Sequence, residues 1–365
     1  MEKKHKSIIV VIAIIVIGVS SFFFFKNNKQ PAKKQININQ KIETTGPRNT
    51  EEVSYLSGLP CENRKRRAVA VMQPADVSAR PASGFSDADM VFEMPVITAS
   101  ITRLMGVYVC GDPEDVGSMR SARHDFLSLA AGLDAIFVHW GRSDVEKFKE
   151  VLNSKTYDDM NCNNDAGKSA EQYCYRKTGM ARGVDTGYAK FAKLLEGAKN
   201  FGYNLENKFV GYPHKEEAPL DQRPSGGHLR VAFAKPYDVE YDYDKATNSW
   251  LRTWAEVADT DRNNSKRLAP KNIVVLMAKS DQLIKGEQYN NVQLGDPWFD
   301  TSDTGEAFYY MNGKQETGTW KKDKSDAKSK LFFYDASGQE VAFVPGQIWV
   351  EILEPGQSLK WVPTN

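Results

Sequence analysis

The residues best suited to chemistry lie between residues 103 and 143, where arginines and serines stand at the ends of apolar runs. They are Arg103, Ser118, Arg120, Ser121, Arg123, Arg142 and Ser143. A guanidinium offers forked donors that match phosphate and carboxylate oxygens, and helices expected to begin near Ser121 and Ser143 would add partial positive charge. The pattern predicts a site for an anionic ligand, such as a glycan or glycopeptide fragment. We take its ligand-binding residues to be Arg103, Arg120, Ser121, Arg123 and Arg142.

An alternative is that these arginines pair internally with nearby carboxylates. The candidate partners are Asp87, Asp89, Glu93, Asp125 and Asp144. Structural arginine–carboxylate pairs are common in proteins, so both interpretations stay open on the sequence. If the binding interpretation holds, one edge of a sheet should gather Glu93, Arg103, Arg120, Ser121, Arg123 and His139. Loops at strand ends expose polar groups above a rigid core.

A hydrolase is the second hypothesis, with Glu93 and His139 as its candidate catalytic residues. Glu93 could serve as a general base, and a Ser121–His139–Asp185 arrangement is conceivable. However, Ser121 lacks the Gly-x-Ser-x-Gly elbow of hydrolases, and His139 lies late in an apolar run, where a hydrogen-bonded core histidine is the commoner case. We therefore expect a binding or scaffold protein rather than an enzyme.

Metal, cofactor and nucleic-acid sites have no sequence signature here. The chain has no His-x-x-x-His, no Cys-x-x-Cys and no acidic loop of calcium type. Its formal net charge is +1, which does not suggest a generally basic surface for nucleic acid. The sequence predicts no metal site, no cofactor and no nucleic-acid partner.

The amino terminus predicts a membrane anchor. Three lysines precede an uncharged apolar run at residues 8–25. Eighteen residues at about 1.5 Å each span roughly 27 Å, close to the hydrocarbon thickness of a bilayer. A cleaved signal peptide with a cut after Ser21 is the alternative. We expect residues 1–25 to form a cytoplasmic tail and transmembrane anchor, and the polar residues 26–50 to form a tether.

Four cysteines follow the apolar run, namely Cys61, Cys110, Cys162 and Cys174. An even set in a body that lies outside the cytoplasmic membrane predicts disulfides, with reduced buried cysteines in a cytosolic domain as the alternative. Cys162 and Cys174 flank a polar loop and are the safer pair, which leaves Cys61 with Cys110 by elimination. The lysines after the run oppose this orientation, because positive charge favours the cytoplasmic side.

The remaining chain predicts an α+β protein with two domains. Residues 51–205 alternate strand-like runs with helices expected at 121–133, at 143–152 behind a Ser143–Glu146 capping box, and at 186–199. Residues 206–226 would connect this α/β domain to a mainly antiparallel β domain at 227–358, a sandwich or barrel.

Tryptophans recur in the second domain, at positions 250, 254, 298, 320 and 349. They could form a sugar-stacking face, although such residues more often fill a core. Trp298 and Trp320 are the expected surface candidates, because polar residues and glycines surround them.

Long segments of the chain resemble the YerB-like lipoprotein family, the domain of unknown function 3048. The segments in the first domain are RAVAVMQ, ARPASGFSDADMVFE, ITRLMGVY and GSMRSARHDFLSLAAGLDAIFVHWG; those in the second include YDYDKATNSWLR, KNIVVLMA and FFYDASGQEVAFVPGQIWVEIL. The resemblance implies the family's two-domain architecture and a place in the bacterial cell envelope. In that location, the partner that we expect is a cell-wall glycan or an envelope protein. It implies no reaction.

The chain departs from the family pattern in three places. Residues 96–100 read VITAS where the family has an acidic residue and two glycines, and residues 183–187 read GVDTG where it has Pro-His-Asn. The lipid-modified cysteine expected of the family is missing, since the first cysteine is Cys61. We therefore expect the helix at 8–25 to replace the lipid as the anchor of a single-pass protein.

Overall fold

A computed structural model describes residues 53–283 and 289–364. The predicted anchor at 8–25 and the tether at 26–50 lie outside the described residues. Within these residues, no helix is both long enough and apolar enough to cross a membrane. The described part is mostly β, with three α-helices, and belongs to the predicted α+β class.

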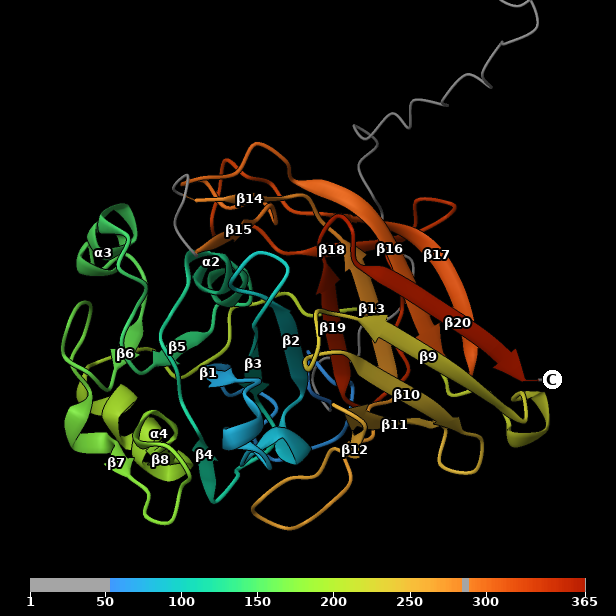
Figure 1. Cartoon of the computed structure of the whole chain (residues 1–365), viewed down its shortest axis with the longest axis horizontal. Coiled ribbons are helices and arrows are strands. Elements are labelled where there is room, and N and C mark those ends of the chain that lie inside the picture. The colour runs from blue at the N-terminus through green and yellow to red at the C-terminus, as the bar shows by residue number, and fades with distance from the viewer. Residues whose placement is uncertain (1–52, 284–288, 365) are drawn as a thin grey trace, which may run out of the picture. The chain divides into compact units, whose positions relative to one another are not determined.

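A large mixed sheet runs through the molecule in the order β18-β17-β16-β13-β19-β2-β3-β1-β5-β6 (Figure 1). In chain order its strands are β1 (Val69–Pro74), β2 (Met90–Pro95), β3 (Thr102–Tyr108), β5 (Ile136–His139), β6 (Asp159–Asn161), β13 (Asn272–Met277), β16 (Thr304–Met311), β17 (Lys314–Lys321), β18 (Phe332–Asp335) and β19 (Ile348–Leu353). Long runs of buried aliphatic and aromatic residues make these central strands suited to a sheet covered on both faces.

Strand β19 joins the two sequence regions into this one sheet. It pairs in parallel with β13 on one side and with β2 on the other, for example Ile348 opposite Met90. The sequence predicts antiparallel pairing after residue 226, and most strand pairs there are antiparallel. The β13–β19 pair is parallel instead. The first and second predicted domains therefore contribute adjacent strands.

A second, antiparallel sheet packs against one face of the large sheet. Its order is β12-β11-β10-β9-β20, with bounds β9 (Gly226–Ala232), β10 (Val239–Asp244), β11 (Ser249–Trp254), β12 (Val257–Ala258) and β20 (Ser358–Thr364). Trp250 lies in the core between the sheets, 5.9 Å from the ring of Tyr310. Trp254, Trp320 and Trp349 are also buried, so the core interpretation holds for them and the surface prediction for Trp320 was wrong.

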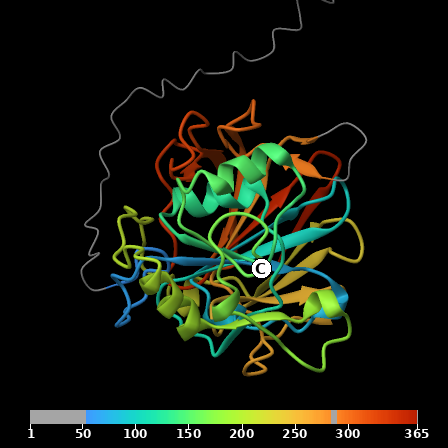
Figure 2. The same ribbon diagram turned by 90° about the vertical axis from the view of Figure 1, so that its left-hand side faces the viewer.

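Three helices lie on the side of the molecule seen in Figure 2: α2 (His124–Gly132), α3 (Glu146–Asn153) and α4 (Phe191–Asn200). Helix α2 begins three residues later than predicted, because Arg123 still has extended backbone. The capping-box prediction was wrong, because α3 begins at Glu146 itself and its N-cap is Val145. The predicted helix at 186–199 starts as a strand and becomes helical only at Phe191.

Short elements complete the described chain. They are β4 (Asp115–Gly117), β7 (Tyr175–Arg176), β8 (Gly187–Lys190), β14 (Ser280–Gln282), β15 (Asn290–Val292) and the 3-10 turns η1 (Val77–Ala79), η2 (Phe85–Asp87), η3 (Glu171–Tyr173), η4 (Gly183–Asp185) and η5 (Leu220–Gln222).

Both predicted disulfides are present. Cys61 pairs with Cys110 at a Cα–Cα distance of 5.7 Å, and Cys162 pairs with Cys174 at 5.9 Å. The first bond ties the segment before β1 to the residues after β3. The second closes the polar loop between β6 and β7.

Candidate functional site

Four of the predicted ligand-binding residues line one cavity of about 400 Å³. They are Arg103, Arg120, Ser121 and Arg123, and the same cavity is also lined by Arg176, Arg182, Trp140 and Asp76. We call this cavity the arginine pocket. Its residues come from the start of β3, the loop after β4, the residue before α2, the end of β7 and the turn before η4. Segments far apart in the sequence thus place five guanidiniums around one space.

Arg103 is the first charge that we would assign to a ligand. Its Nη1 donates a hydrogen bond of 2.6 Å to the carbonyl oxygen of Ser121, and the structure has no carboxylate within ion-pair distance among the described residues. Burial, followed by the like charges of Arg123 and Arg120, lowers the pKa of Arg103 well below its usual value. An anion in the pocket would offset both the cost of burying the Arg103 charge and its repulsion by Arg123 and Arg120.

Arg123 has a similar environment on the other side of the Ser121 carbonyl. Its Nη1 donates to the carbonyl oxygen of Ala122 at 2.9 Å, and its guanidinium carbon lies 5.1 Å from the ring centre of Tyr289. Its buried Nε has no hydrogen-bond partner in the described structure. Burial lowers the pKa of Arg123 to about 10. The cation–π contact orients the group without neutralising it.

Arg120 differs, because it is already neutralised. Its Nη2 lies 2.5 Å from the fully buried carboxylate of Asp185 and 3.4 Å from that of Asp76. Its Nη1 also donates to the carbonyl oxygen of Val184. Internal pairing therefore applies to Arg120, although the partners Asp76 and Asp185 are not those proposed from the sequence.

Arg176 and Arg182 were not among the predicted site residues. Arg176 stacks on Trp140, with its guanidinium carbon 4.1 Å from the ring centre, and the buried indole N–H of Trp140 has no partner among the described residues. Arg182 is exposed and lies 3.7 Å from Asp76. Both arginines belong to the polar stretch that follows Cys174. The residue pattern of that stretch does not indicate that they reach the pocket. Trp140, on which Arg176 stacks, directly follows His139 in the sequence.

Arg142 lies outside the residues that line the pocket. Its Nη1 donates to the carbonyl oxygen of Ser143 at 2.9 Å and lies 3.4 Å from the exposed carboxylate of Asp144. The structure therefore does not group Arg142 with the other predicted arginines. Arg142 pairs instead with Asp144, one of the carboxylates that the alternative interpretation named.

Glu93 lies on the opposite face of the large sheet from Arg103. Along β2, Met90, Phe92 and Met94 enter the core that contains Phe126 of α2, whereas Val91 enters the core beneath the second sheet. Glu93 follows Val91 onto this second face, because successive side chains of a strand alternate. The expected convergence of Glu93 with the arginines is therefore wrong.

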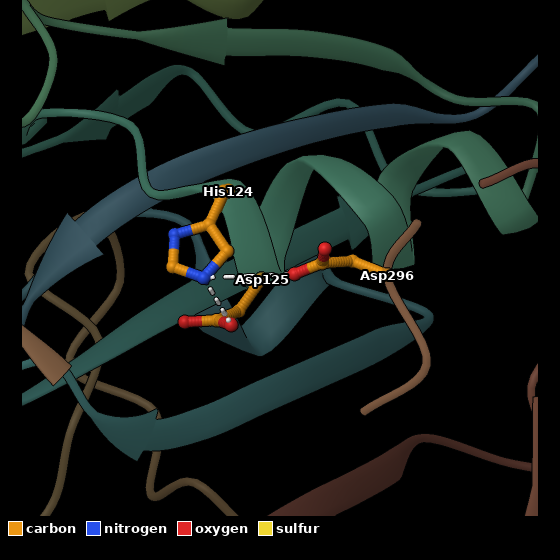
Figure 3. Close-up of side chains that lie close together, drawn as sticks. All are labelled: His124, Asp125 and Asp296. Atoms are coloured by element: carbon orange, nitrogen blue, oxygen red, sulfur yellow. Dashed lines mark ion pairs between the residues drawn. The ribbon is translucent and has the colours of Figure 1, made fainter. Parts of the chain in front are cut away.

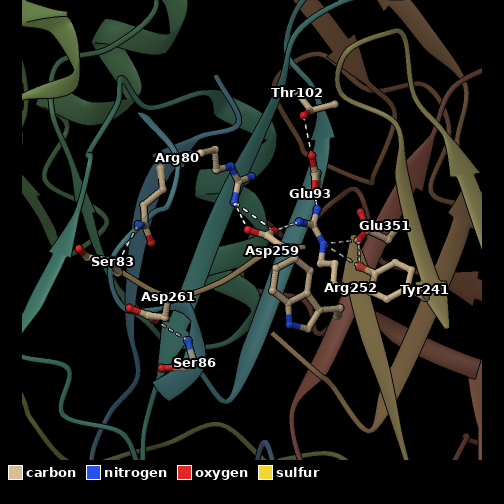
Figure 4. A network of polar contacts seen from close by, with 12 residues as sticks. Arg80, Ser83, Ser86, Glu93, Thr102, Tyr241, Arg252, Asp259, Asp261 and Glu351 are labelled. Atoms are coloured by element: carbon tan, nitrogen blue, oxygen red, sulfur yellow. Dashed lines mark hydrogen bonds and ion pairs between the residues drawn. The ribbon is translucent and has the colours of Figure 1, made fainter. Parts of the chain in front are cut away.

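A buried ionic network holds Glu93 in that core (Figure 4). Arg252 of β11 pairs with both Glu93 and Asp259, and Thr102 donates a hydrogen bond of 2.6 Å to Glu93. Glu351 of β19 accepts a hydrogen bond from Tyr241. Burial, followed by the charge of Glu93, raises the pKa of Glu351 to about 8. The network joins the two sheets and consists of buried groups.

His139 is buried separately from the pocket lining. Its Nδ1 lies 2.7 Å from the carbonyl oxygen of Gly141, and its Nε2 lies 3.3 Å from the carboxylate of Asp159. Asp185, the third member of the conceivable triad, pairs with Arg120 instead. The environment of His139 is that of a hydrogen-bonded core histidine.

Known proteins resemble this chain along most of its length. The N-terminal domain of the "Protein of unknown function (DUF3048)" matches residues 56–204, and the C-terminal domain of the same description matches residues 229–350. A protein of Bacillus subtilis named "Putative lipoprotein YerB" is 29% identical over 310 residues, which cover 82% of this chain and 85% of that protein.

A crystal structure of the YerB protein from Bacillus subtilis has a similar fold. The match has a TM-score of 0.70 at 27% sequence identity, and it covers 84% of this chain and 99% of the crystallised one. The two domain matches together span most of the chain, in the same order as the predicted domains. The chain therefore belongs to the YerB-like family of proteins with DUF3048 domains.

Proposed function

We propose that this protein is a membrane-anchored binding module of the bacterial cell envelope, whose arginine pocket holds a ligand that carries phosphate or carboxylate groups. The observation that carries this proposal is the charge of the pocket. Five arginines line it, whereas Asp76 is the acidic residue among its described lining. Asp185 adds a second carboxylate through its contact with Arg120.

The size and composition of the pocket support a small anionic group rather than a large apolar ligand. A volume of about 400 Å³ is at the lower end of ordinary ligand sites. Arg103 and Arg123 offer unneutralised donors, and planar forked guanidiniums suit bidentate contact with phosphate or carboxylate. Cell-envelope glycans and glycopeptides present both groups, so a fragment of such a polymer is the ligand class that we propose.

The proposed address is supported by two independent features. The apolar run at 8–25 has the length and flanks of an anchor, and both disulfides require an oxidising compartment. The name of the Bacillus subtilis relative describes a lipoprotein, which is also an anchored protein. We propose that a single helix anchors this chain and that its body lies outside the cytoplasmic membrane.

Titration calorimetry with the full chain in detergent tests the proposal. The probes are a muropeptide with free carboxylates, glycerol 3-phosphate, and an uncharged disaccharide as the comparison. We expect an anionic probe to bind, and Arg103→Gln to weaken it at least about tenfold, since charge-assisted hydrogen bonds contribute roughly 1.5–3 kcal/mol. Arg230→Gln is the matched control, because Arg230 lies on β9 of the other sheet and pairs with Asp238. Equal binding by both variants would contradict the proposal.

A further inference from the structure

A second group of chemically active side chains lies at the start of α2, one residue beyond Arg123. It comprises His124, Asp125 and Asp296, which are each 1% exposed (Figure 3). Their potential ligand atoms all lie within 4.8 Å of one another. His124 Nε2 is 2.9 Å from Asp125 Oδ1, 3.5 Å from Asp296 Oδ2 and 2.8 Å from the amide oxygen of Asn291.

Hydrogen bonding within the protein does not satisfy this cluster. A single N–H at His124 Nε2 faces both the amide oxygen of Asn291 at 2.8 Å and Asp125 Oδ1 at 2.9 Å. Apart from the contacts of 2.9 and 3.5 Å to His124 Nε2, the buried oxygens Asp125 Oδ1 and Asp296 Oδ2 have no hydrogen-bond partner in the described structure. Buried carboxylate oxygens are costly unless they are paired or coordinate a metal. Three oxygens and one nitrogen therefore face one point, and a single proton cannot form hydrogen bonds to all three oxygens.

The surrounding residues hold these atoms toward that point. The other oxygen of Asp296, Oδ1, accepts the backbone N–H groups of Trp298 and Phe299 at 2.7 and 2.8 Å, which leaves Oδ2 turned toward His124. The ring of Phe299 packs edge-on against His124 with a centroid distance of 4.6 Å. Outer contacts of this kind fix the orientation of metal ligands in known sites.

We propose that His124 Nε2, Asp125 Oδ1, Asp296 Oδ2 and Asn291 Oδ1 bind a divalent transition-metal ion, with Zn²⁺ as the best match. Zn²⁺ takes imidazole and carboxylate ligands at about 2.0–2.2 Å in a tetrahedron, which places ligand atoms roughly 3.4 Å apart. The distances from His124 Nε2 to the three proposed oxygen ligands are 2.8, 2.9 and 3.5 Å, which lie near or somewhat below that separation. A calcium ion would need six to eight oxygen ligands, so the imidazole disfavours it.

The ion would connect the start of α2 with the distant segment formed by β15 and the loop after it. His124 and Asp125 open α2, Asn291 belongs to β15, and Asp296 follows β15 in the loop that leads toward β16. Arg123 of the arginine pocket directly precedes the first ligand. The ion would thus stabilise the junction on which that pocket is built, and this role is independent of whether the pocket binds an anion.

The test uses the full chain in detergent, without a histidine tag. The chain is stripped with a chelator, and Zn²⁺, Mg²⁺ and Ca²⁺ are then titrated by calorimetry and by thermal unfolding. We expect one equivalent of Zn²⁺ to bind and to raise the melting temperature, with no comparable effect of Mg²⁺ or Ca²⁺. Co²⁺ in place of Zn²⁺ should give the visible absorption of a tetrahedral site.

Asp296→Asn keeps the shape of the side chain and removes its charge. We expect it to weaken Zn²⁺ binding by more than about tenfold, since loss of even an outer-shell partner costs 10–100-fold. Asp144→Asn is the control, because the Asp144 side chain is 90% exposed. If stripped wild-type protein binds no stoichiometric Zn²⁺, or if Asp296→Asn binds it equally well, the site is a buried histidine–carboxylate cluster and the proposal is wrong. If Asp296→Asn fails to fold, the wild-type Co²⁺ spectrum decides.

Discussion

Arg103 and Arg123 share the backbone carbonyl oxygen of Ser121. Arg103 donates to it at 2.6 Å and Arg123 at 3.4 Å, although one residue belongs to β3 and the other precedes α2. Two guanidiniums on one neutral acceptor repel each other, and neither has a carboxylate partner among the described residues. This juxtaposition is what distinguishes the arginine pocket from a set of structural ion pairs.

Substitution of Arg103 should affect binding more than folding. Arg103→Gln removes a charge that repels Arg123 and Arg120, so loss of its hydrogen bond is partly offset. We expect the free energy of unfolding to change by less than about 1 kcal/mol. Chemical denaturation measures this change. A loss of several kcal/mol would show that Arg103 is structural.

Substitution of Arg120 should have the opposite effect. Arg120→Ala leaves the fully buried carboxylate of Asp185 without its closest cation, with only Arg182 remaining at 3.8 Å. We expect stability to fall by roughly 3 kcal/mol, because removal of one partner of a buried pair strands the other charge. The double variant with Asp185→Asn should recover part of this loss. If Arg120→Ala melts like the wild type, the pair is not stabilising.

The network between the two sheets predicts that stability falls as the pH rises from about 4.5 to about 8. Glu351 has a pKa of about 8 in the folded protein, against an ordinary value of 4.5. The folded state therefore binds this proton more tightly than the unfolded state. The resulting stabilisation is complete below about pH 4.5 and is lost as the pH rises through 8.

Denaturation with urea between about pH 4 and pH 9 measures this dependence. Glu351→Gln should flatten it, because glutamine stays neutral and still accepts the hydrogen bond from Tyr241. Glu114→Gln is the control, since the Glu114 side chain is 77% exposed. An equally steep fall in the Glu351→Gln protein would assign the effect to another group.

The disulfides should contribute unequally to stability. Chain-entropy arguments give about 3 kcal/mol for the loop of sequence separation 12 closed by Cys162–Cys174, and about 4 kcal/mol for the separation of 49 closed by Cys61–Cys110. The comparison requires Cys162→Ser/Cys174→Ser and Cys61→Ser/Cys110→Ser variants, each unfolded by denaturant. A non-reducing peptide map establishes the connectivity in the purified wild type. Free thiols in protein from the envelope fraction would contradict the prediction.

Protease accessibility tests the proposed address. Protease added to intact spheroplasts should degrade the body of the chain, because residues 50–365 are expected outside the cytoplasmic membrane. A cytoplasmic marker protein should survive the same treatment. Full protection of the body, with digestion only after lysis, would place it in the cytoplasm.

The sequence by itself determined the local features of this protein. Apolar runs with turn signals between them identified the α+β class. The polar loop between Cys162 and Cys174 identified one disulfide, and elimination gave Cys61–Cys110. The arginines at 103, 120 and 123 could also be selected, because they stand where apolar runs end. These signals depend on near neighbours in the chain, which is why they can be read without a structure.

Only the tertiary structure decided which of the selected residues meet. Glu93 and Arg103 lie on adjacent strands, where Glu93 is opposite Leu104 and Met94 is opposite Arg103. This register sends their side chains to opposite faces of the sheet. Glu93 then meets Arg252, which is 159 residues away and comes from the second sheet. Strand alternation is local, but which element covers each face depends on long-range pairing, such as that of β19 with β2.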